Sequence, residues 1–139
     1  MKKNKIAVIG QGYVGLPLAI EFGKIYPTFG FDINETRIVD LKNGIDHTNE
    51  ANIEQIKSAD QLIFSSKINE IKNCNIYIIT VPTPIDEFKT PELNPLRTAS
   101  RMVGSILKKG DIVIYESTVY PGCTEEVCIP LLEKASNLI

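Results

Sequence analysis

Apolar and polar positions along the chain follow two alternating periods. Short runs of β-branched and aliphatic residues alternate with longer stretches in which apolar residues recur every three or four positions. The short runs predict strands at residues 5–9, 28–31, 62–65, 75–81 and 111–115. The longer stretches predict helices at residues 14–24, 34–42, 52–59, 94–107 and 124–136, with a helical turn at 67–72.

The order of these elements predicts the fold class. Strand and helix alternate from end to end, which favours an α/β fold of the Rossmann type: a doubly wound, mainly parallel sheet with helices on both faces. Segments 75–81 and 111–115 are apolar at successive positions, as strands buried on both faces are. Residues 1–139 contain neither a linker nor an internal repeat, and they suit one domain.

Residues at the predicted helix ends support these boundaries. Asn34 and Asn94 can each cap a helix, and Pro95 suits a first helical position, where its missing N–H is harmless. Gly44 favours a helix end. The spacing of apolar residues groups Val14, Leu18 and Phe22 on one face of the first helix and turns Ile38 and Leu41 of the second inward.

One segment combines a glycine pattern with a strand before it and a helix after it. Gly10-Gln11-Gly12-Tyr13-Val14-Gly15 has the spacing G-x-G-x-x-G, and Asp32 ends the next strand. In dinucleotide-binding proteins these glycines make a tight turn, admit the pyrophosphate and let the helix pack closely, while the helix N-terminus faces the phosphates. Because a carboxylate at Asp32 would bind ribose hydroxyls and repel a 2′-phosphate, the pattern predicts NAD rather than NADP. The alternative is an ordinary strand-to-helix loop.

Three segments follow the carboxyl ends of predicted strands. They are Gly10 to Gly15, Val81 to Ile85 and Glu116 to Val119. In open parallel sheets, ligands bind beyond the carboxyl ends of the strands. We therefore expect the three segments to converge on one crevice.

Composition narrows the class of protein. The chain has 139 residues, of which 43% are hydrophobic, and a net charge of -2, which offers no electrostatic footprint for nucleic acid or an anionic membrane. The apolar run after the basic start is too short for a signal peptide, and no run approaches a membrane span. A cytoplasmic location is the default expectation.

The residue types that often carry chemistry are sparse. The three cysteines, Cys74, Cys123 and Cys128, have no C-x-x-C spacing, so neither a disulfide framework nor a metal site is expected. His47 is the single histidine and lies in a polar stretch, which is typical of a loop residue rather than a catalytic base.

Longer motifs resemble a known family. The string Tyr13-Val14-Gly15-Leu16-Pro17, the loop Val81-Pro82-Thr83-Pro84 and the segment Glu116-Ser117-Thr118-Val119 are similar to those of the UDP-glucose/GDP-mannose dehydrogenases, the nucleotide-sugar 6-dehydrogenases. The segment Ser117 to Glu126, read with Pro82 to Asp86, resembles the branch that acts on UDP-N-acetylhexosamines for surface polysaccharides such as bacterial capsule. The resemblance covers almost the whole chain but only the family's N-terminal domain.

The resemblance implies a reaction. Family members oxidise the sugar C6 alcohol to a carboxylate with two NAD+, through an aldehyde and a thioester on a cysteine. By analogy, residues Gly10 to Gly15 hold the pyrophosphate, Asp32 and Arg37 hold the adenosine end, and Val81, Pro82, Thr83 and Pro84 run along the cofactor. Ser117, Thr118 and Val119 lie near the nicotinamide, and Thr118 helps to place the catalytic water.

Several of these residues have plainer interpretations. Arg37 follows a helix start and is also compatible with a solvated surface charge. Thr83 could simply order a proline-rich loop, and Thr118 could be a helix cap or a strand end. Glu125 and Glu126 suit the first turn of a helix and are assigned no catalytic role.

The family's catalytic cysteine belongs to a segment beyond residue 139, and no cysteine of this chain lies in a matching segment. Cys123, at a helix start, is the nearest to the site. We therefore expect residues 1–139 to be the NAD-binding part of a longer two-domain enzyme, to bind NAD weakly and to turn over no UDP-sugar alone. The full enzyme is expected to be a homodimer, and the fragment a monomer. The alternatives are an NAD(H)-sensing module and a dehydrogenase of the 6-phosphogluconate or 3-hydroxyacyl-CoA type.

Overall fold

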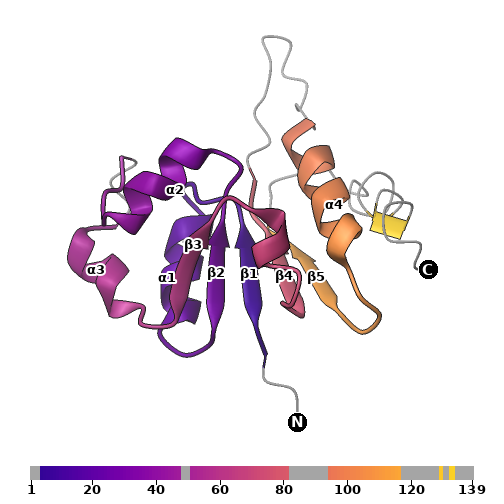
Figure 1. Cartoon of the computed structure of the whole chain (residues 1–139), viewed down its shortest axis with the longest axis horizontal. Helices are drawn as coiled ribbons and strands as arrows, with labels where there is room; N and C mark the ends of the chain where they lie inside the picture. Colours follow the sequence, from indigo (N-terminus) through magenta and orange to yellow (C-terminus); the bar gives the residue numbers. More distant parts are fainter. Residues whose placement is uncertain (1–3, 48–50, 82–93, 117–128, 130–131, 134–139) are drawn as a thin grey trace.

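Parallel strands form one sheet in the part of the chain that the structure, a computed structural model, describes: residues 4–47, 51–81, 94–116, 129 and 132–133. The strand order is β3-β2-β1-β4-β5, and every pairing is parallel (Figure 1). The strands are β1 (Ile6–Ile9), β2 (Thr28–Phe31), β3 (Leu62–Ser65), β4 (Ile76–Ile79) and β5 (Ile112–Tyr115). The helices are α1 (Gly15–Gly23), α2 (Glu35–Lys42), α3 (Ile53–Ser58) and α4 (Asn94–Ile106), with a 3-10 turn η1 at Ile68–Glu70.

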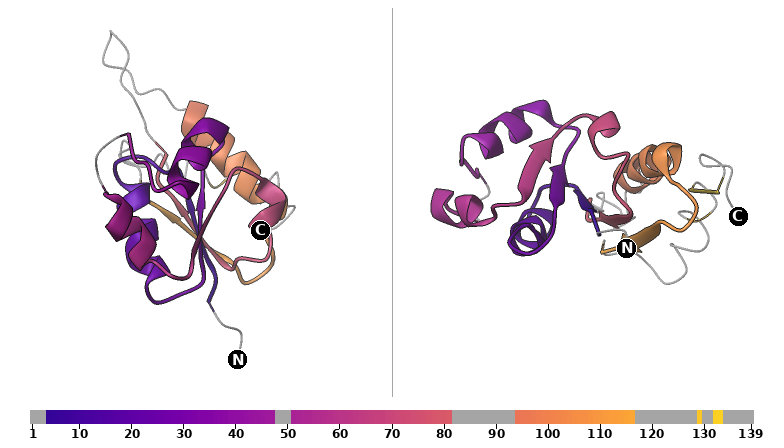
Figure 2. Two further views of the ribbon diagram at one scale, coloured as in Figure 1. Left: turned by 60° about the vertical axis from the view of Figure 1, so that its left-hand side comes forward. Right: turned by 60° about the horizontal axis from the view of Figure 1, so that its bottom comes forward.

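The predicted fold class is confirmed, because helices cover both faces of this sheet. Alternate residues of β1 and β4 face opposite sides: Ala7 and Tyr77 belong to a cluster with α4, whereas Val8 and Ile78 pack with α1. The second view of Figure 2 shows α1 and α4 on opposite sides of the strands. Helices α2 and α3 pack beside α1 in a further apolar cluster, to which the predicted inward residues Ile38 and Leu41 belong.

Strand β5 departs from the prediction that it is buried on both faces. Ile112 and Ile114 are 53% and 39% exposed, while Val113 and Tyr115 pack against the cluster under α4. The strand is an outer one in the sheet, and no described helix covers the face that Ile112 and Ile114 present. An apolar run cannot by itself distinguish a central strand from an outer one.

Helix α1 packs closely against the sheet. Leu18 and Phe22, expected on one face of the helix, are half-buried and pack against the cluster that contains Val8 and Ile78, whereas Val14 precedes the helix and is 49% exposed. The buried residues of the helix are Gly15, Leu16, Ala19, Ile20 and Gly23. The approach is close, since a Cβ at Gly23 would lie 2.7 Å from the Cβ of Leu62. Small residues therefore occupy the contact, and the larger ones flank it.

Asparagines begin two of the helices. The side-chain oxygen of Asn34 accepts from the Arg37 N–H at 3.2 Å, as predicted, and Asn52 forms a reciprocal capping box with Gln55. Helix α2 ends at the predicted place, with Gly44 at a φ of 77°. The predicted cap Asn94 is instead the first residue of α4.

The last predicted helix, at 124–136, lies mostly outside the described residues, although Ile129, Leu132 and Glu133 are helical. Within the described residues, no helix combines the length and apolar character that a membrane span needs.

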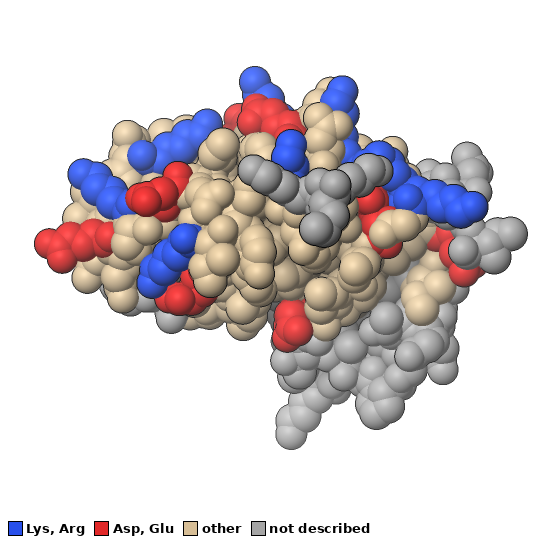
Figure 3. All heavy atoms as spheres, turned by 90° about the horizontal axis from the view of Figure 1, so that it is seen from below, with Lys and Arg blue, Asp and Glu red and all other residues tan. Residues whose placement is uncertain are grey.

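Viewed from the amino ends of the strands, lysines and arginines are interspersed with acidic side chains over the described surface (Figure 3).

Cys74 lies in the core beneath α4 and is 1% exposed. Burial raises the pKa of its thiol to about 11. Because the thiolate is the nucleophilic form, this cysteine is unsuited to covalent catalysis at neutral pH.

We expect the Cys74 thiol of the folded chain to resist iodoacetamide at pH 8, where roughly one thiol in a thousand would be ionised even if reagent could reach it. The measurement is peptide mass spectrometry of the Cys74 peptide after timed alkylation. The same reaction in urea is the control and should proceed at the rate of a free thiol. Equal rates in the folded and unfolded chain would contradict the assigned burial.

Candidate functional site

Hydrogen bonds just beyond the strands join the carboxyl ends of all five strands. The Gly10 N–H donates to the Phe31 oxygen at 2.7 Å, and the Thr80 N–H donates to the Ile9 oxygen at 2.8 Å. The same ladder continues at the outer strands, through Asp32 and Glu116. Three features named from the sequence therefore lie along one edge of the sheet: the glycine turn, Asp32 and Glu116, which precedes Ser117.

The glycine turn is packed directly against the end of β4. Gly10 has a φ of 98°, which favours glycine, and its carbonyl oxygen accepts from the Thr80 hydroxyl at 2.8 Å. A Cβ at Gly15 would collide with the Gly10 carbonyl and with the Thr80 hydroxyl. Thr80 therefore holds the turn in place. Sequence pattern gives no signal for this role of Thr80, because a threonine at the end of a β-branched strand is typical of the strand itself.

The N-terminus of α1 is open. Among the described residues no side chain caps it, and its first turn holds no acidic residue, in contrast to the capped α2 and α3. A Cβ at Gly12 would meet no atom within 4 Å, and Tyr13 is 70% exposed. Because the first N–H groups of a helix have no partner within the helix, this end can receive an anionic group.

Asp32 is held at the rim by two backbone groups. One carboxylate oxygen accepts from the Gln11 N–H at 2.9 Å, and the other accepts from the Asn34 N–H at 2.9 Å. Each carboxylate oxygen has a second lone pair, so Asp32 keeps the capacity to bind a further donor. The carboxylate is thus oriented before any ligand arrives.

The side chain of Gln11 points into the protein rather than toward a ligand. It is fully buried, and its amide nitrogen donates to the Val8 oxygen at 3.0 Å and the Gly10 oxygen at 3.2 Å. A Cβ at Gly30 would lie 2.7 Å from its oxygen. Gln11 therefore takes part in the site mainly through its backbone.

Arg37 is half-buried, and its guanidinium is bonded within the protein. Its Nε donates to the Gln11 backbone oxygen at 2.8 Å, and its Nη1 lies 2.8 Å from Oδ1 of Asp46. The exposed fraction of the side chain is 11% for Arg37 and zero for Asp46. The alternative of a solvated surface charge is therefore wrong for Arg37. The sequence does not reveal the role of Asp46, because only folding brings Arg37 to it.

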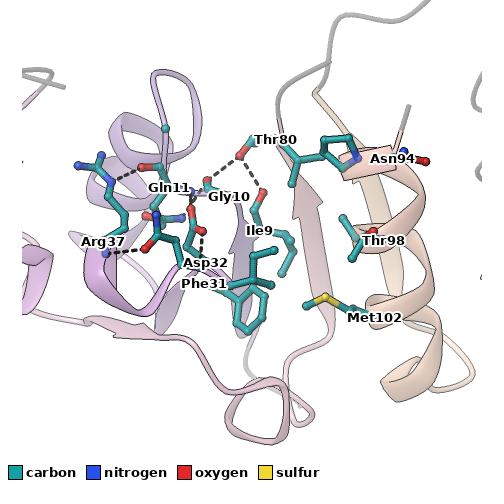
Figure 4. Close-up of a pocket in the computed structure, with 16 residues that line it drawn as sticks. Ile9, Gly10, Gln11, Phe31, Asp32, Arg37, Thr80, Asn94, Thr98 and Met102 are labelled. Atoms are coloured by element: carbon teal, nitrogen blue, oxygen red, sulfur yellow. Dashed lines mark hydrogen bonds between the residues drawn. The ribbon is translucent and has the colours of Figure 1, made fainter. Parts of the chain in front are cut away.

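A cavity of about 550 Å³ lies over this edge of the sheet. Figure 4 shows Asp32, Arg37 and the glycine turn on one side and Thr98 and Met102 of α4 on the other. Val81 also lines it. The α4 wall was not anticipated, since helical periodicity does not reveal which face of a helix looks onto a neighbouring loop.

Other predicted site residues lie outside the described residues. These are Pro82, Thr83, Pro84, Ser117, Thr118 and Val119, together with Cys123 and Cys128. His47 is described, lies in the loop after α2 as predicted, and pairs with Asp40 at 2.9 Å.

Known proteins share both the sequence and the fold. The chain is 58% identical over 138 residues to a UDP-N-acetyl-D-glucosamine 6-dehydrogenase of Pseudomonas aeruginosa, covering 99% of this chain and 33% of that protein. It is 50% identical to protein CapL of Staphylococcus aureus, covering 100% of this chain and 32% of CapL. The structure of UDP-D-ManNAc dehydrogenase from Pyrococcus horikoshii superposes with a TM-score of 0.86 at 35% identity, covering 96% of this chain and 33% of that one.

The chain thus spans about a third of the length of the curated relatives it matches. Residues 4–138 match the family described as "UDP-glucose/GDP-mannose dehydrogenase family, NAD binding domain". The open helix end, the anchored Asp32 and the cavity beside them are the features that an NAD-binding domain requires. The chain therefore belongs to the UDP-glucose/GDP-mannose dehydrogenase family, of which it represents the NAD-binding domain.

Proposed function

We propose that this chain is the cofactor-binding part of a nucleotide-sugar 6-dehydrogenase. The proposed reaction is oxidation of the C6 alcohol of UDP-N-acetylglucosamine, or of a closely related UDP-N-acetylhexosamine, to the uronic acid. The substrate class is supported by the 58% identity to an enzyme whose name specifies UDP-N-acetyl-D-glucosamine. Use of the product in a surface polysaccharide, a cytoplasmic location and a homodimeric full-length enzyme are parts of the same proposal.

The observation that carries the proposal is the combination of an open helix end and an anchored carboxylate at one rim. The α1 N-terminus and the bare Gly12 would receive the pyrophosphate, and Asp32 would accept from the adenosine ribose hydroxyls. The adenine would enter the cavity between the glycine turn and α4. NAD+ bound there supplies the chemistry of hydride acceptance.

The reacting end of the site remains a proposal from the family resemblance. Ser117, Thr118 and Val119 would lie near the nicotinamide, with Thr118 placing the water, and Pro82, Thr83 and Pro84 would border the cofactor. Glu116, hydrogen-bonded through its N–H to the Ile79 oxygen, leads into the first of these segments. The thiol that carries the acyl group would belong to another part of the enzyme, since Cys74 is buried in the core.

Calorimetric titration of the 139-residue chain tests this assignment. We expect weak but saturable binding of NAD+ and NADH, and much weaker binding of NADP+, because Asp32 repels a 2′-phosphate. Absence of NAD+ binding by the folded chain would contradict the proposal. A parallel absorbance assay with NAD+ and UDP-N-acetylglucosamine should show no steady NADH production. Sustained turnover would contradict the view that the catalytic thiol lies elsewhere.

Two glycine substitutions separate binding from folding. Gly12→Ala should leave the free energy of unfolding within about 1 kcal/mol of the wild type, because its Cβ meets open space. It should weaken NAD+ by about tenfold or more, because the methyl group lies where the pyrophosphate approaches the backbone. Gly15→Ala should instead cost about 1–3 kcal/mol of stability, because its Cβ collides with the turn and Thr80.

Urea unfolding followed by circular dichroism and calorimetric titration with NAD+ give the two quantities for each variant. If Gly12→Ala lost as much stability as Gly15→Ala, or bound NAD+ like the wild type, the separate roles assigned to the two glycines would be wrong.

A further inference from the structure

The end of the cavity proposed to hold the ribose contains two charged groups, of which one favours NAD and the other favours NADP. Asp32 is the acid expected of an NAD-binding protein, whereas an arginine nearby is what NADP-binding proteins use to hold the 2′-phosphate. Arg37 lines the same cavity as Asp32. The sequence therefore carries both devices within five positions, and the fold must decide whether the arginine is available.

The geometry shows the guanidinium to be already engaged. Nε is bonded to the Gln11 backbone oxygen and Nη1 to Asp46, both at 2.8 Å. Nη2 is buried and has no hydrogen-bond partner among the described residues. Since a guanidinium is planar with donors in a fixed fork, two bonds from different edges fix the direction of the whole group.

Asp46 is itself firmly placed. Its side chain has no exposed area, and its second oxygen accepts from the Ala51 N–H at 2.9 Å, across the connection between α2 and α3. A carboxylate without solvent contact is costly unless it is paired, so Asp46 and Arg37 each hold the other in its buried position.

We propose that Asp46 is a specificity-determining residue that acts through Arg37. By neutralising the guanidinium and holding it against the glycine turn, Asp46 withholds from a 2′-phosphate the one cationic side chain in the described cavity wall. Asp32 repels the 2′-phosphate directly, and Asp46 removes the attraction that a free Arg37 guanidinium would exert on it. The inference rests on the proposed NAD-binding function and deepens it.

The test compares the dissociation constants for NADP+ and NAD+ in matched variants of the whole chain. Asp46→Asn should lower the NADP+/NAD+ ratio of dissociation constants by about tenfold or more, because the released guanidinium can form charge-assisted bonds to the phosphate. Adding Arg37→Gln should abolish that gain. Asp40→Asn is the charge-matched control, since Asp40 lies on α2 and pairs with His47 rather than Arg37, and its ratio should stay within about twofold of the wild type.

A purely structural role for Asp46 predicts a different result. Both affinities would then weaken together and the ratio would not move, which would overturn the proposal. A gain that persisted without Arg37 would overturn it as well. Thermal unfolding of each variant checks the fold, and Asp46→Ser, which also removes the carboxylate, is the second variant if Asp46→Asn does not fold.

Arg37→Gln in the otherwise wild-type chain is an independent measurement. It should leave the NADP+/NAD+ ratio nearly unchanged, because Asp46 already withholds the arginine; selective loss of NADP+ binding would contradict the proposal. Failure of the wild-type chain to bind NAD+ would contradict the proposed function itself. If the wild-type chain binds NAD+ but the Asp46 variants have the same NADP+/NAD+ ratio of dissociation constants as the wild type, only this inference is contradicted.

Discussion

The contact between the glycine turn and the end of β4 leaves no space for a side chain. Gly15 lies against the Gly10 carbonyl, and the Thr80 hydroxyl donates to that same carbonyl at 2.8 Å. This packing sets where α1 begins relative to β1 and β4. Gly10 to Gly12, which lead into the helix, consequently line the cavity, and the first N–H groups of the helix follow directly after them. The binding end of the helix is therefore a consequence of close packing beneath it.

The same turn is tied to the ribose end of the site through the Gln11 backbone. Its N–H donates to Asp32 and its carbonyl oxygen accepts from Arg37, which is paired with Asp46. The groups proposed to face the cofactor thus also satisfy the polar groups of the turn. A site held in this way loses little conformational freedom on binding, which favours affinity. These hydrogen bonds also fix the orientation of the Asp32 and Arg37 side chains.

Much of the fold could be predicted from local pattern. The strand and helix positions, the Asn34 cap and the inward positions of Ile38 and Leu41 follow from periodicity and capping chemistry, which act over a few residues. The exposure of Ile112 was predicted wrongly. Exposure depends on which neighbour covers the strand, and a strand of the same composition can occupy either environment.

The sequence alone determined the order of elements, the glycine turn and the acid at Asp32, because each is encoded within a short stretch of chain. Only the tertiary structure decided how the charges are used. Thr80 meets Gly10 across 70 positions, and Arg37 meets the Gln11 carbonyl across 26. From the sequence, Arg37 could be a surface charge or a ligand, and the fold instead pairs it with the buried Asp46. Burial of the carboxylate makes the difference, since an ion pair whose acid has no exposed area has a fixed geometry that no local pattern specifies.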